Sequence, residues 1–430
     1  LDTDRLMQQS DVVLHLGRLM LAAGAGSYRI KSSMARAASA VGLDRHEATV
    51  TMTEIVTSSY VGNRFRTEAC EVRRVGVNVA RLEALRRIVH DLRAHETVEH
   101  LEAKLEQVEK MHARYNAFAN AAASGVACAG FCFLNKGGWV ECLTVLVAAF
   151  LGQFIRRQML ERHYQHFFTR LVCGVVASGT YMGIVTALNA AGVVAGNHQG
   201  GIISAILFLI PGFPMVTGML DISRMDFLAG ISRLTYVGLL LLSASFAVWV
   251  LGSLFHLPLA APAPLNLDPT LYLLLQVLSS GVAAAGFAML FAASPVACVW
   301  GGVIAAVANP IRIHMVEAGM PAHMAATIAV FGVGILAEIV APLHQRKYTR
   351  ISLSVPAVVT MVPGVPFYRS MSHFASGDMY SAASGFVQSL LIFMALGMGL
   401  AFVRLIFDKN WLFDQDTQVL NRLDTDRHLR

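Results

Sequence analysis

The segment IPGFPMVTGM, residues 210–219, is repeated as VPGVPFYRSM, residues 362–371, at an offset of 152 positions. Both copies contain the pattern P-G-x-P, and both are followed by an aspartate, Asp226 in the first copy and Asp378 in the second. The two aspartates are themselves separated by the same offset. The agreement extends beyond one short motif and indicates an internal repeat.

A second match lies upstream of each P-G-x-P segment. AGFCFL at residues 129–134 resembles AGFAML at residues 285–290, at an offset of 156, and the likeness continues from IRRQM at residues 155–159 to IRIHM at residues 311–315. Two matches in the same order are much harder to produce by chance than one. The sequence therefore predicts a duplicated structural unit.

The composition identifies the solvent in which this unit lies. Of the 430 residues, 55% are hydrophobic and only 14% are charged, whereas soluble domains carry about 25% charged residues. Residues 1–115 hold 17 of the 34 Lys and Arg residues and 15 of the 28 Asp and Glu residues. We therefore expect a polytopic α-helical membrane protein with an N-terminal α+β domain in the cytoplasm.

Ten apolar segments follow the N-terminal domain, and we interpret each as a transmembrane helix. The expected spans are residues 116–134, 139–155, 167–191, 200–219, 228–256, 270–291, 296–314, 321–341, 353–370 and 381–407. Five spans precede the long linker and five follow it. Because five is odd, the second copy enters the bilayer in the opposite direction, so the prediction is ten transmembrane helices arranged as two five-helix inverted repeats.

The expected boundaries and orientation follow from charge and hydropathy. The boundaries are 1–115 for the cytoplasmic domain, 116–256 and 270–407 for the two repeats, 257–269 for an extracytoplasmic linker and 408–430 for a cytoplasmic tail. Basic residues cluster after the second and the eighth spans, and the linker contains no Lys or Arg. The positive-inside rule then places both termini in the cytoplasm, which fits a bacterial cytoplasmic (inner) membrane.

Within the N-terminal domain, residues 47–75 alternate Thr, Val and Ile and predict strands, with a hairpin at Gly62-Asn63. Two helices follow, and Thr97 is the expected N-cap of the second. The sequence between this helix and the first span has neither Pro nor Gly. It therefore predicts that the two helices are continuous.

The repeated prolines predict helix breaks. Proline lacks an N–H and blocks the helical carbonyl four residues earlier, so Pro211 and Pro214 should free the carbonyls of Leu207 and Ile210. Pro363 and Pro366 should do the same for Val359 and Val362. Unpaired backbone groups occur at membrane depth only beside protein or a water-filled cavity, so we expect a polar path at Gly212 and Gly364. The alternative is an ordinary proline kink packed against a neighbour.

Three aspartates follow these breaks. Asp226 and Asp378 begin the fifth and tenth spans, at opposite membrane faces on the expected topology, where each is either an N-cap or a proton site at one mouth of the path. Asp221 lies near Arg224, and the choice there is between a site and a solvated loop pair. Arg369 is either a carboxylate ligand or an interfacial anchor.

Several polar residues inside or near the expected spans are weaker candidates. They are Glu141, Asn189, Asn309 and Glu338. Glu141 and Glu338 lie near span ends, where snorkelling to the interface is the alternative. Asn309 precedes Pro310, which suggests another helix break.

Other functions are disfavoured by the motifs that are absent from the sequence. There is no HExxH, Walker A, GxGxxG or GxSxG element, so we expect neither an enzyme nor a bound metal or cofactor. The net charge of +6 is accounted for by basic anchors rather than by nucleic-acid binding. The expected partners are a small-molecule substrate, protons and the lipid bilayer, and association into a homo-oligomer stays open.

At these residues the chain resembles the threonine/serine exporter family. The matching elements are Gly24 to Arg29 as G-A-x-x-x-R, Leu209 to Gly212 followed by Asp221 and Asp226, and Val362 to Gly364 followed by Tyr368, Arg369 and Asp378. Two positions depart from the family pattern. Lys31 stands where the family usually has Glu, and Met225 stands where it usually has Gly.

The resemblance implies proton-driven efflux of threonine and serine, and family members split into two polypeptides imply export of small dicarboxylates such as succinate. It also makes Arg29 a candidate; the alternative is a residue of the first turn of a soluble helix. A channel gated by the soluble domain and a membrane enzyme are the rival functions. The gradient, rather than ATP bound to this chain, is the expected energy source.

Overall fold

The computed structural model describes residues 2–73, 75–193, 201–255, 265–343 and 349–408. They divide into two compact units. The first unit comprises the described residues within 1–114, 214–235 and 401–408, and the second comprises those within 115–213 and 236–400.

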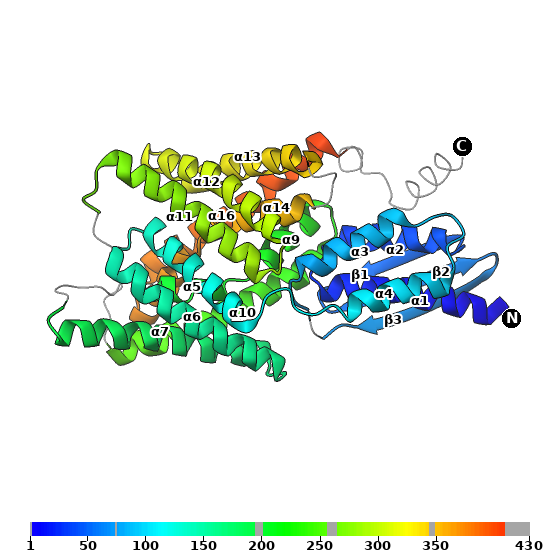
Figure 1. The fold of residues 1–430 in the computed structure, drawn as a ribbon, viewed down its shortest axis with the longest axis horizontal. Helices are drawn as coiled ribbons and strands as arrows, with labels where there is room; N and C mark the ends of the chain where they lie inside the picture. Colours follow the sequence, from blue (N-terminus) through cyan, green and yellow to red (C-terminus); the bar gives the residue numbers. More distant parts are fainter. Residues whose placement is uncertain (1, 74, 194–200, 256–264, 344–348, 409–430) are drawn as a thin grey trace. The chain divides into compact units, whose positions relative to one another are not determined.

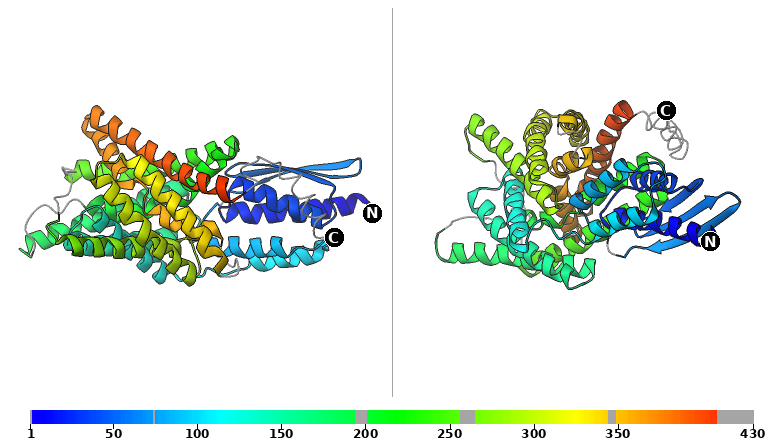
Figure 2. Two further views of the ribbon diagram at one scale, coloured as in Figure 1. Left: turned by 90° about the horizontal axis from the view of Figure 1, so that it is seen from above. Right: turned by 45° about the vertical axis from the view of Figure 1, so that its right-hand side comes forward.

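The first unit contains the expected α+β domain (Figure 1). Its strands β1 (Arg45–Val50), β2 (Glu54–Val61) and β3 (Arg64–Glu71) form an antiparallel sheet in that order. One face of the sheet is covered by α1 (Asp2–Ala22) and α2 (Ser27–Ala40), and α3 (Val79–Asp91) and α4 (Val98–Glu109) lie beyond these two helices (Figure 2). Buried Leu, Ile, Val and Met side chains from the helices and strands form one core.

Local predictions for this domain are confirmed. Val61 pairs with Arg64 across a turn at Gly62-Asn63, and Gly62 has a φ of 55°, a left-handed conformation that glycine adopts without steric cost. The Thr97 hydroxyl accepts a hydrogen bond from His100 N, so Thr97 is the N-cap of α4. The expected continuity with the first span is wrong, because α4 ends at Glu109 and the side chain of Asn116 caps a new helix.

The second unit is a bundle of long apolar helices. It contains α5 (Ala117–Leu134), α6 (Trp139–Glu161), α7 (His166–Ala190), α11 (Pro269–Leu290), α12 (Pro295–Glu317), α13 (Ala322–Leu343) and most of α10 (Phe227–Phe255) and α16 (Met379–Phe407). Among the described residues, eight helices are long and apolar enough to cross a membrane. Their large apolar side chains are exposed in rows, such as Leu271, Leu274 and Leu278 on α11, which suits lipid rather than water.

Two of the ten expected spans differ from a single helix. Residues 353–370 fall on α14 (Arg350–Val359) and α15 (Gly364–Ser376), a pair bent by 45° that would make a ninth span. The expected span 200–219 begins outside the described residues. Its described part consists of α8 (Ile202–Ala205), the 3-10 turn η2 (Leu207–Leu209) and α9 (Gly212–Ser223), so eight or nine spans are described rather than ten.

The helix bounds of the two halves agree with the sequence repeat. Adding 156 to the bounds of α6, Trp139 and Glu161, gives the bounds of α12, Pro295 and Glu317. Adding 152 to the bounds of α10, Phe227 and Phe255, gives the bounds of α16, Met379 and Phe407. The α5 and α11 helices also begin 152 residues apart, at Ala117 and Pro269.

The turns that end these helices are repeated as well. Left-handed φ angles occur in pairs at the two offsets, at Lys136 and Ala292, at His163 and Gly319, and at Met225 and Gly377. The last pair closes α9 and α15 with the same hydrogen bonds, because Asp226 N donates to Asp221 O and Asp378 N donates to His373 O. This is the Schellman pattern, in which a left-handed residue ends a helix.

Candidate functional site

The two P-G-x-P segments each separate two helical pieces. The first follows η2 and the second follows α14, and the next helix begins at the glycine in both, Gly212 for α9 and Gly364 for α15. Pro214 and Pro366 lie in the first turn of those helices, where the N–H has no helical partner in any case. The prolines therefore define where α9 and α15 begin.

The carbonyls expected to be free at these breaks are hydrogen-bonded, so that part of the prediction is wrong. Two short turns satisfy them, with the same donors in both halves. The bonds are Ile210 N to Leu207 O at 3.1 Å, Gly212 N to Ile210 O at 2.9 Å, Val362 N to Val359 O at 3.2 Å and Gly364 N to Val362 O at 2.8 Å. A tight turn replaces each helical bond that proline removes. The breaks therefore change the direction of the chain but leave none of these carbonyls unpaired.

The two breaks contact each other reciprocally within the second unit. A Cβ atom added to Gly212 would lie 2.7 Å from Val359 Cγ2, and one added to Gly364 would lie 3.0 Å from Leu207 Cδ2. Leu207 and Val359 are themselves 152 residues apart. Each glycine thus packs against the residue that precedes the other break, at a distance that leaves no room for a side chain.

The α5 and α11 helices cross in the same reciprocal manner. A Cβ atom on Gly130 would lie 2.9 Å from Ser279 O, and one on Gly286 would lie 2.7 Å from Ala123 O. Both the glycines and their partners are 156 residues apart. Phe131 and Phe287, also related by 156, meet edge to face with ring centroids 5.6 Å apart. Contacts of i with j and of j with i are the signature of a two-fold interface.

Two repeat-related polar chains run between neighbouring helices of this unit. In the first, Arg156 Nη1 donates to Gln153 Oε1 at 3.1 Å and Gln153 Nε2 donates to Asn120 Oδ1 at 2.7 Å. In the second, Arg312 Nε donates to Asn309 Oδ1 at 2.9 Å and Asn309 Nδ2 donates to Ser280 Oγ at 3.0 Å. Adding 156 converts Gln153 and Arg156 into Asn309 and Arg312.

These chains hold polar groups that have little contact with water. The amide and hydroxyl side chains are buried, and Gln276, which is 156 residues after Asn120, has both side-chain atoms buried without a partner among the described residues. The expected helix break at Asn309 is wrong, since α12 continues through Pro310 and the Asn309 side chain serves the polar chain instead. Extending the IRRQM match at its own offset would have identified these pairs from sequence.

The G-A-x-x-x-R element contacts the end of α9 inside the first unit. Gly24 has a φ of 90°, which allows the turn between α1 and α2. Ser27 N then donates to Asp221 Oδ1 at 2.9 Å, and a Cβ atom on Gly26 would lie 3.1 Å from that oxygen. We call this contact, Ala25 to Ser27 with Thr217, Asp221 and Arg233, the motif junction.

Arg233 completes the motif junction and was not singled out from sequence. Its Nη2 donates to Ala25 O at 3.0 Å and its Nη1 donates to Thr217 Oγ1 at 2.9 Å. Its Nε lies 3.5 Å from Asp221 Oδ2, within ion-pair range but too far for a hydrogen bond. Asp221 and Arg233 are 3% and 2% exposed.

The surroundings of Asp221 shift its titration toward neutral pH. Burial raises the pKa of Asp221 from 3.8 to about 6, against the opposing effects of Arg233 and of the hydrogen bond from Ser27 N. Burial disfavours the charged carboxylate because it removes water. Asp221 is therefore a carboxyl group that can exchange a proton near physiological pH.

The remaining motif residues lie next to the junction. Lys31 Nζ forms an ion pair with Asp226 Oδ1, so the lysine that departs from the family pattern has a carboxylate partner. The Arg224 guanidinium stacks over the Tyr28 ring, 4.5 Å from its centroid. Arg29 lies in the first turn of α2, where its N–H donates to Gly26 O.

Asp378 lies at the N-terminus of α16, in the second unit. Its Oδ1 accepts a hydrogen bond from Ser381 N at 3.1 Å, and its Oδ2 lies 3.5 Å from His373 Nδ1. Hydrogen bonding with Ser381 lowers the pKa of Asp378. This is the geometry of an N-cap. Upstream on α15, Tyr368 is 1% exposed, and neither its hydroxyl nor Arg369 Nε has a hydrogen-bond partner among the described residues.

The weaker candidates occupy separate places. Glu338 on α13 is buried and forms an ion pair with Arg350, the first residue of α14, at 2.6 Å. Glu141 is in the first turn of α6, where a carboxylate is favoured by the helix dipole. Asn189 is exposed near the end of α7. The ion pair of Glu338 joins α13 to α14, the helix that precedes the second P-G-x-P break.

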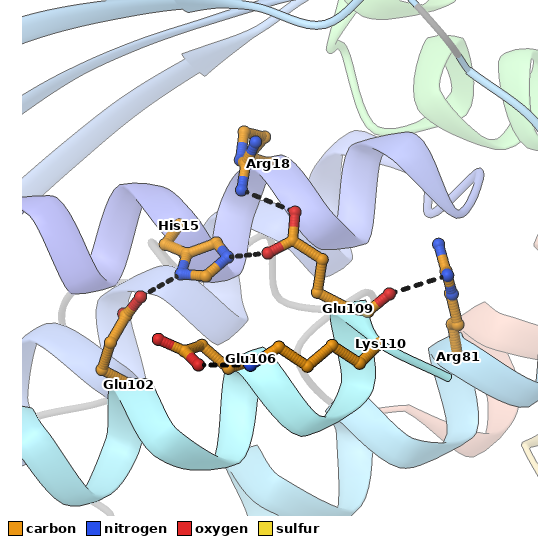
Figure 3. Close-up of polar contacts among 7 residues, drawn as sticks. All are labelled: His15, Arg18, Arg81, Glu102, Glu106, Glu109 and Lys110. Carbon is orange, nitrogen blue, oxygen red and sulfur yellow. Dashed lines mark hydrogen bonds and ion pairs between the residues drawn. The ribbon is translucent and has the colours of Figure 1, made fainter. Parts of the chain in front are cut away.

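An open groove of about 820 Å³ between α1 and α4 is lined by charged side chains (Figure 3). His15 Nδ1 lies 2.7 Å from Glu102 Oε1, and Arg18 Nη2 donates to Glu109 Oε1 at 2.9 Å. Lys110 pairs with Glu106 at 2.8 Å. The contacts of His15 and Arg18 join α1 to α4, whereas the Lys110–Glu106 pair lies within the last turn of α4. Among the described residues, no cluster of His, Cys, Asp and Glu is arranged to hold a metal ion.

Comparison with protein families gives two matches along the chain. A model described as "Putative threonine/serine exporter" matches residues 11–255, more than half of the chain. A second, described as "Threonine/Serine exporter, ThrE", matches residues 276–406. Together they cover both halves of the repeat.

Curated relatives are distant. "Probable succinate transporter subunit YjjP" of Escherichia coli (strain K12) is 23% identical over 253 residues, covering 58% of this chain and 95% of the relative. The protein of the same name from Klebsiella aerogenes is 24% identical over 233 residues, covering 53% and 87%. No solved structure matches the chain.

Proposed function

Since the chain belongs to the threonine/serine exporter family, with both family domains in one polypeptide, we propose that it is a secondary active transporter that exports small polar metabolites. The family description favours threonine and serine as substrates. The names of the relatives favour succinate or another small dicarboxylate. The proton gradient across the bacterial cytoplasmic membrane would supply the energy.

The reciprocal contact between the two P-G-x-P breaks carries this proposal. In inverted-repeat transporters, discontinuous helices from the two halves meet near the middle of the membrane, and one half rocks against the other. Here Gly212 packs against Val359 and Gly364 against Leu207, and α5 and α11 cross in the same reciprocal way. We propose that residues 116–256 and 270–407 are inverted five-helix repeats and that substrate passes beside the crossing glycines.

The motif junction supports the proposed topology. Residues 214–235, which join two proposed spans, belong to the same compact unit as the N-terminal domain, and Asp221 is hydrogen-bonded to Ser27. These residues must therefore lie on the same membrane face. Residues 401–408, at the end of α16, belong to this unit too, which supports placing both termini in the cytoplasm.

Proton coupling is proposed to involve Asp221. Its pKa of about 6 lets it bind and release a proton over the range spanned by a proton gradient, and its oxygens contact both the N-terminal domain and Arg233. Protonation would weaken its attraction to Arg233. Asp226 and Asp378, at the starts of α10 and α16, stay candidates for the two mouths of the path.

A channel gated by the N-terminal domain is the second candidate, because the motif junction ties that domain directly to α9 and α10. Counterflow separates the two functions. Purified full-length protein would be reconstituted in vesicles preloaded with unlabelled serine, threonine or succinate, and entry of the labelled compound would be measured. A transporter is expected to show faster entry into preloaded than into empty vesicles. Equal entry into both would contradict the proposal.

A further inference from the structure

Two arginines lie close together inside the second unit without a carboxylate partner. Arg170 on α7 is only 8% exposed and lies within electrostatic range of Arg156 on α6. Its Nη1 atom is buried and has no hydrogen-bond partner among the described residues. Neither guanidinium has an ion-pair partner among the Asp and Glu residues that the structure describes, and the electrostatic neighbours of Arg156 are Cys173 and Tyr236.

Such an arrangement is costly unless an anion joins it. Arginine does not lose its proton in proteins, and a buried charge without a partner costs several kcal/mol. Arg170 cannot reach the lipid headgroups by snorkelling, because its side chain is enclosed rather than extended to the surface. The two positive charges also repel each other. No described residue supplies the compensating negative charge, so the site suits an anionic ligand.

The groups around the arginines have donors suited to carboxylate oxygens. Tyr236 and Tyr368 have hydroxyl groups within electrostatic range of Arg170. The Tyr368 hydroxyl is buried without a partner among the described residues, and Tyr236 Oη lies 2.7 Å from His166 Nδ1. Tyr368 is four residues after Gly364, so this cluster borders the second P-G-x-P break.

The cluster is present once, not twice. Adding 156 to Arg156 gives Arg312, but adding 156 to Arg170 gives Ala326, so the doubled positive charge occurs in one half only. The repeat explains Arg156 as part of the first polar chain. It does not explain Arg170, which points to a function beyond the symmetric scaffold.

We propose that Arg156, Arg170, Tyr236 and Tyr368 form the anion-binding part of the substrate site, and that it takes a small dicarboxylate in preference to a zwitterionic amino acid. Two uncompensated positive charges match two carboxylates. An amino acid would bring an ammonium group beside two guanidinium groups, and none of the groups identified around them is acidic. This inference rests on the proposed export function and selects among its substrates.

The test measures binding separately from transport. Full-length protein in zwitterionic lipid would be titrated with succinate, succinamate, serine and threonine, and ligand affinity would be obtained from the rise in melting temperature. Succinate is expected to bind at least about 10-fold more tightly than succinamate or either amino acid, as the loss of one charge-assisted pair implies. Serine or threonine binding as tightly as succinate would overturn the preference for a dicarboxylate.

Variants locate the site. Arg170→Gln, Arg156→Gln and Tyr368→Phe are expected to weaken succinate binding, by about 10- to 100-fold for the arginines. Arg170→Lys, which keeps the charge but loses the planar fork, should have an intermediate effect and serves if the Gln variant does not fold. Arg162→Gln removes an exposed positive charge just after α6 and should bind as the parent does. Unchanged succinate affinity in both Arg156→Gln and Arg170→Lys would overturn the proposal.

Two further outcomes distinguish related failures. If phosphatidylglycerol, but not succinate, stabilises the protein through Arg170, the site holds a lipid phosphate and the proposal is wrong. If the parent shows succinate counterflow and the Arg170 variants show it with the same half-saturating succinate concentration, this inference is wrong but the export function stands. Arg170-dependent succinate binding without any counterflow would leave this site in place and contradict the transport function.

Discussion

Asp221 combines deep burial, an ionic partner and a backbone donor from a segment 194 positions earlier in the chain. Its carboxyl group binds a proton more tightly in the folded than in the unfolded protein, because burial raises its pKa to about 6. The folded state is therefore penalised as the pH rises from about 4 to about 6, and the penalty is complete above that range. Two pKa units correspond to about 3 kcal/mol.

Replacing Asp221 with Asn should remove this pH dependence. The melting temperature of the parent, in detergent, is expected to fall between pH 4 and pH 6 by more than that of Asp221→Asn, because the amide does not titrate. The comparison is of slopes, because the substitution can also change the contacts with Ser27 and Arg233 at any one pH. Asp91→Asn, at an exposed carboxylate, is the control and should keep the parent slope. Parallel curves for parent and Asp221→Asn would refute the pKa shift.

Met225 occupies a position where glycine is favoured. Its φ is 62°, it closes the Schellman turn after α9, and its repeat counterpart is Gly377 with a φ of 81°. Left-handed backbone costs a residue with a side chain about 1–2 kcal/mol. Met225→Gly should therefore raise the free energy of unfolding by about 1 kcal/mol, and Gly377→Ala should lower it by a similar amount, measured by thermal unfolding. A destabilising Met225→Gly would contradict the turn geometry.

Asp378 distinguishes a helix cap from a proton site. Asn caps a helix as well as Asp does, so Asp378→Asn should be nearly neutral for stability, whereas Asp378→Ala should cost about 1 kcal/mol. Thermal unfolding of both variants measures the contribution of capping to stability. Efflux driven by a pH gradient, measured for Asp378→Asn, tests for a role in proton coupling. If Asp378→Asn folds normally but loses coupling to the pH gradient, Asp378 has a role in transport in addition to capping.

At the level of helices, the crossing of the two breaks depends on glycine. Gly212→Ala and Gly364→Ala should each destabilise the protein by about 1–3 kcal/mol, since the added methyl group meets Val359 in one case and Ile210 and Leu207 in the other. Transport should fall in both variants. Thermal unfolding and counterflow would be measured together.

The chain provides matched controls for this change. Gly238 on α10 and Gly332 on α13 have no heavy atom within 4 Å of an added Cβ. Gly238→Ala and Gly332→Ala should raise stability slightly or leave it unchanged, because alanine favours helix. If all four alanine variants behaved alike, close approach at the crossing would not be the reason for glycine at the two breaks.

Elements governed by short-range pattern were predictable from sequence. The hairpin at Gly62-Asn63, the cap at Thr97 and the breaks at both P-G-x-P segments follow from turn chemistry, capping and proline sterics. Whether the carbonyls at the breaks are hydrogen-bonded was not predictable, because a tight turn can supply a backbone N–H donor in place of the one that proline lacks. The pieces of α8 and η2 escaped prediction since apolar composition alone does not distinguish a span from packed short turns.

The motif junction and the arginine cluster could be identified only from the tertiary structure. Ser27 and Asp221 are far apart in sequence, and neither neighbourhood shows that they meet. From sequence, Arg156 and Arg170 are predicted to be positive-inside anchors of the loop between the second and third spans. The α6 helix extends to Glu161, which places Arg156 within a helix of the bundle, and Arg170 lies near the start of α7. The repeat at offset 156 was the one sequence signal for the polar chains.

For the whole molecule, the inverted repeat predicts opposite exposure of equivalent loops. Arg162 follows α6 and Ala318 follows α12, they are 156 residues apart, and both are exposed. In a cysteine-free background, Ala318→Cys should react with a membrane-impermeant maleimide added to intact cells. Arg162→Cys should react only after the membrane is permeabilised. Labelling of both from one side would contradict the inverted arrangement.

Secondary active transport is the central claim, and accumulation against a concentration gradient tests it most directly. Full-length protein would be reconstituted in vesicles with an imposed pH gradient, and labelled succinate, serine and threonine would be followed. We predict that at least one of them reaches a higher concentration inside than outside, and that a protonophore abolishes the difference. Movement that stops at equal concentrations for every permeant compound would contradict the account and identify a channel.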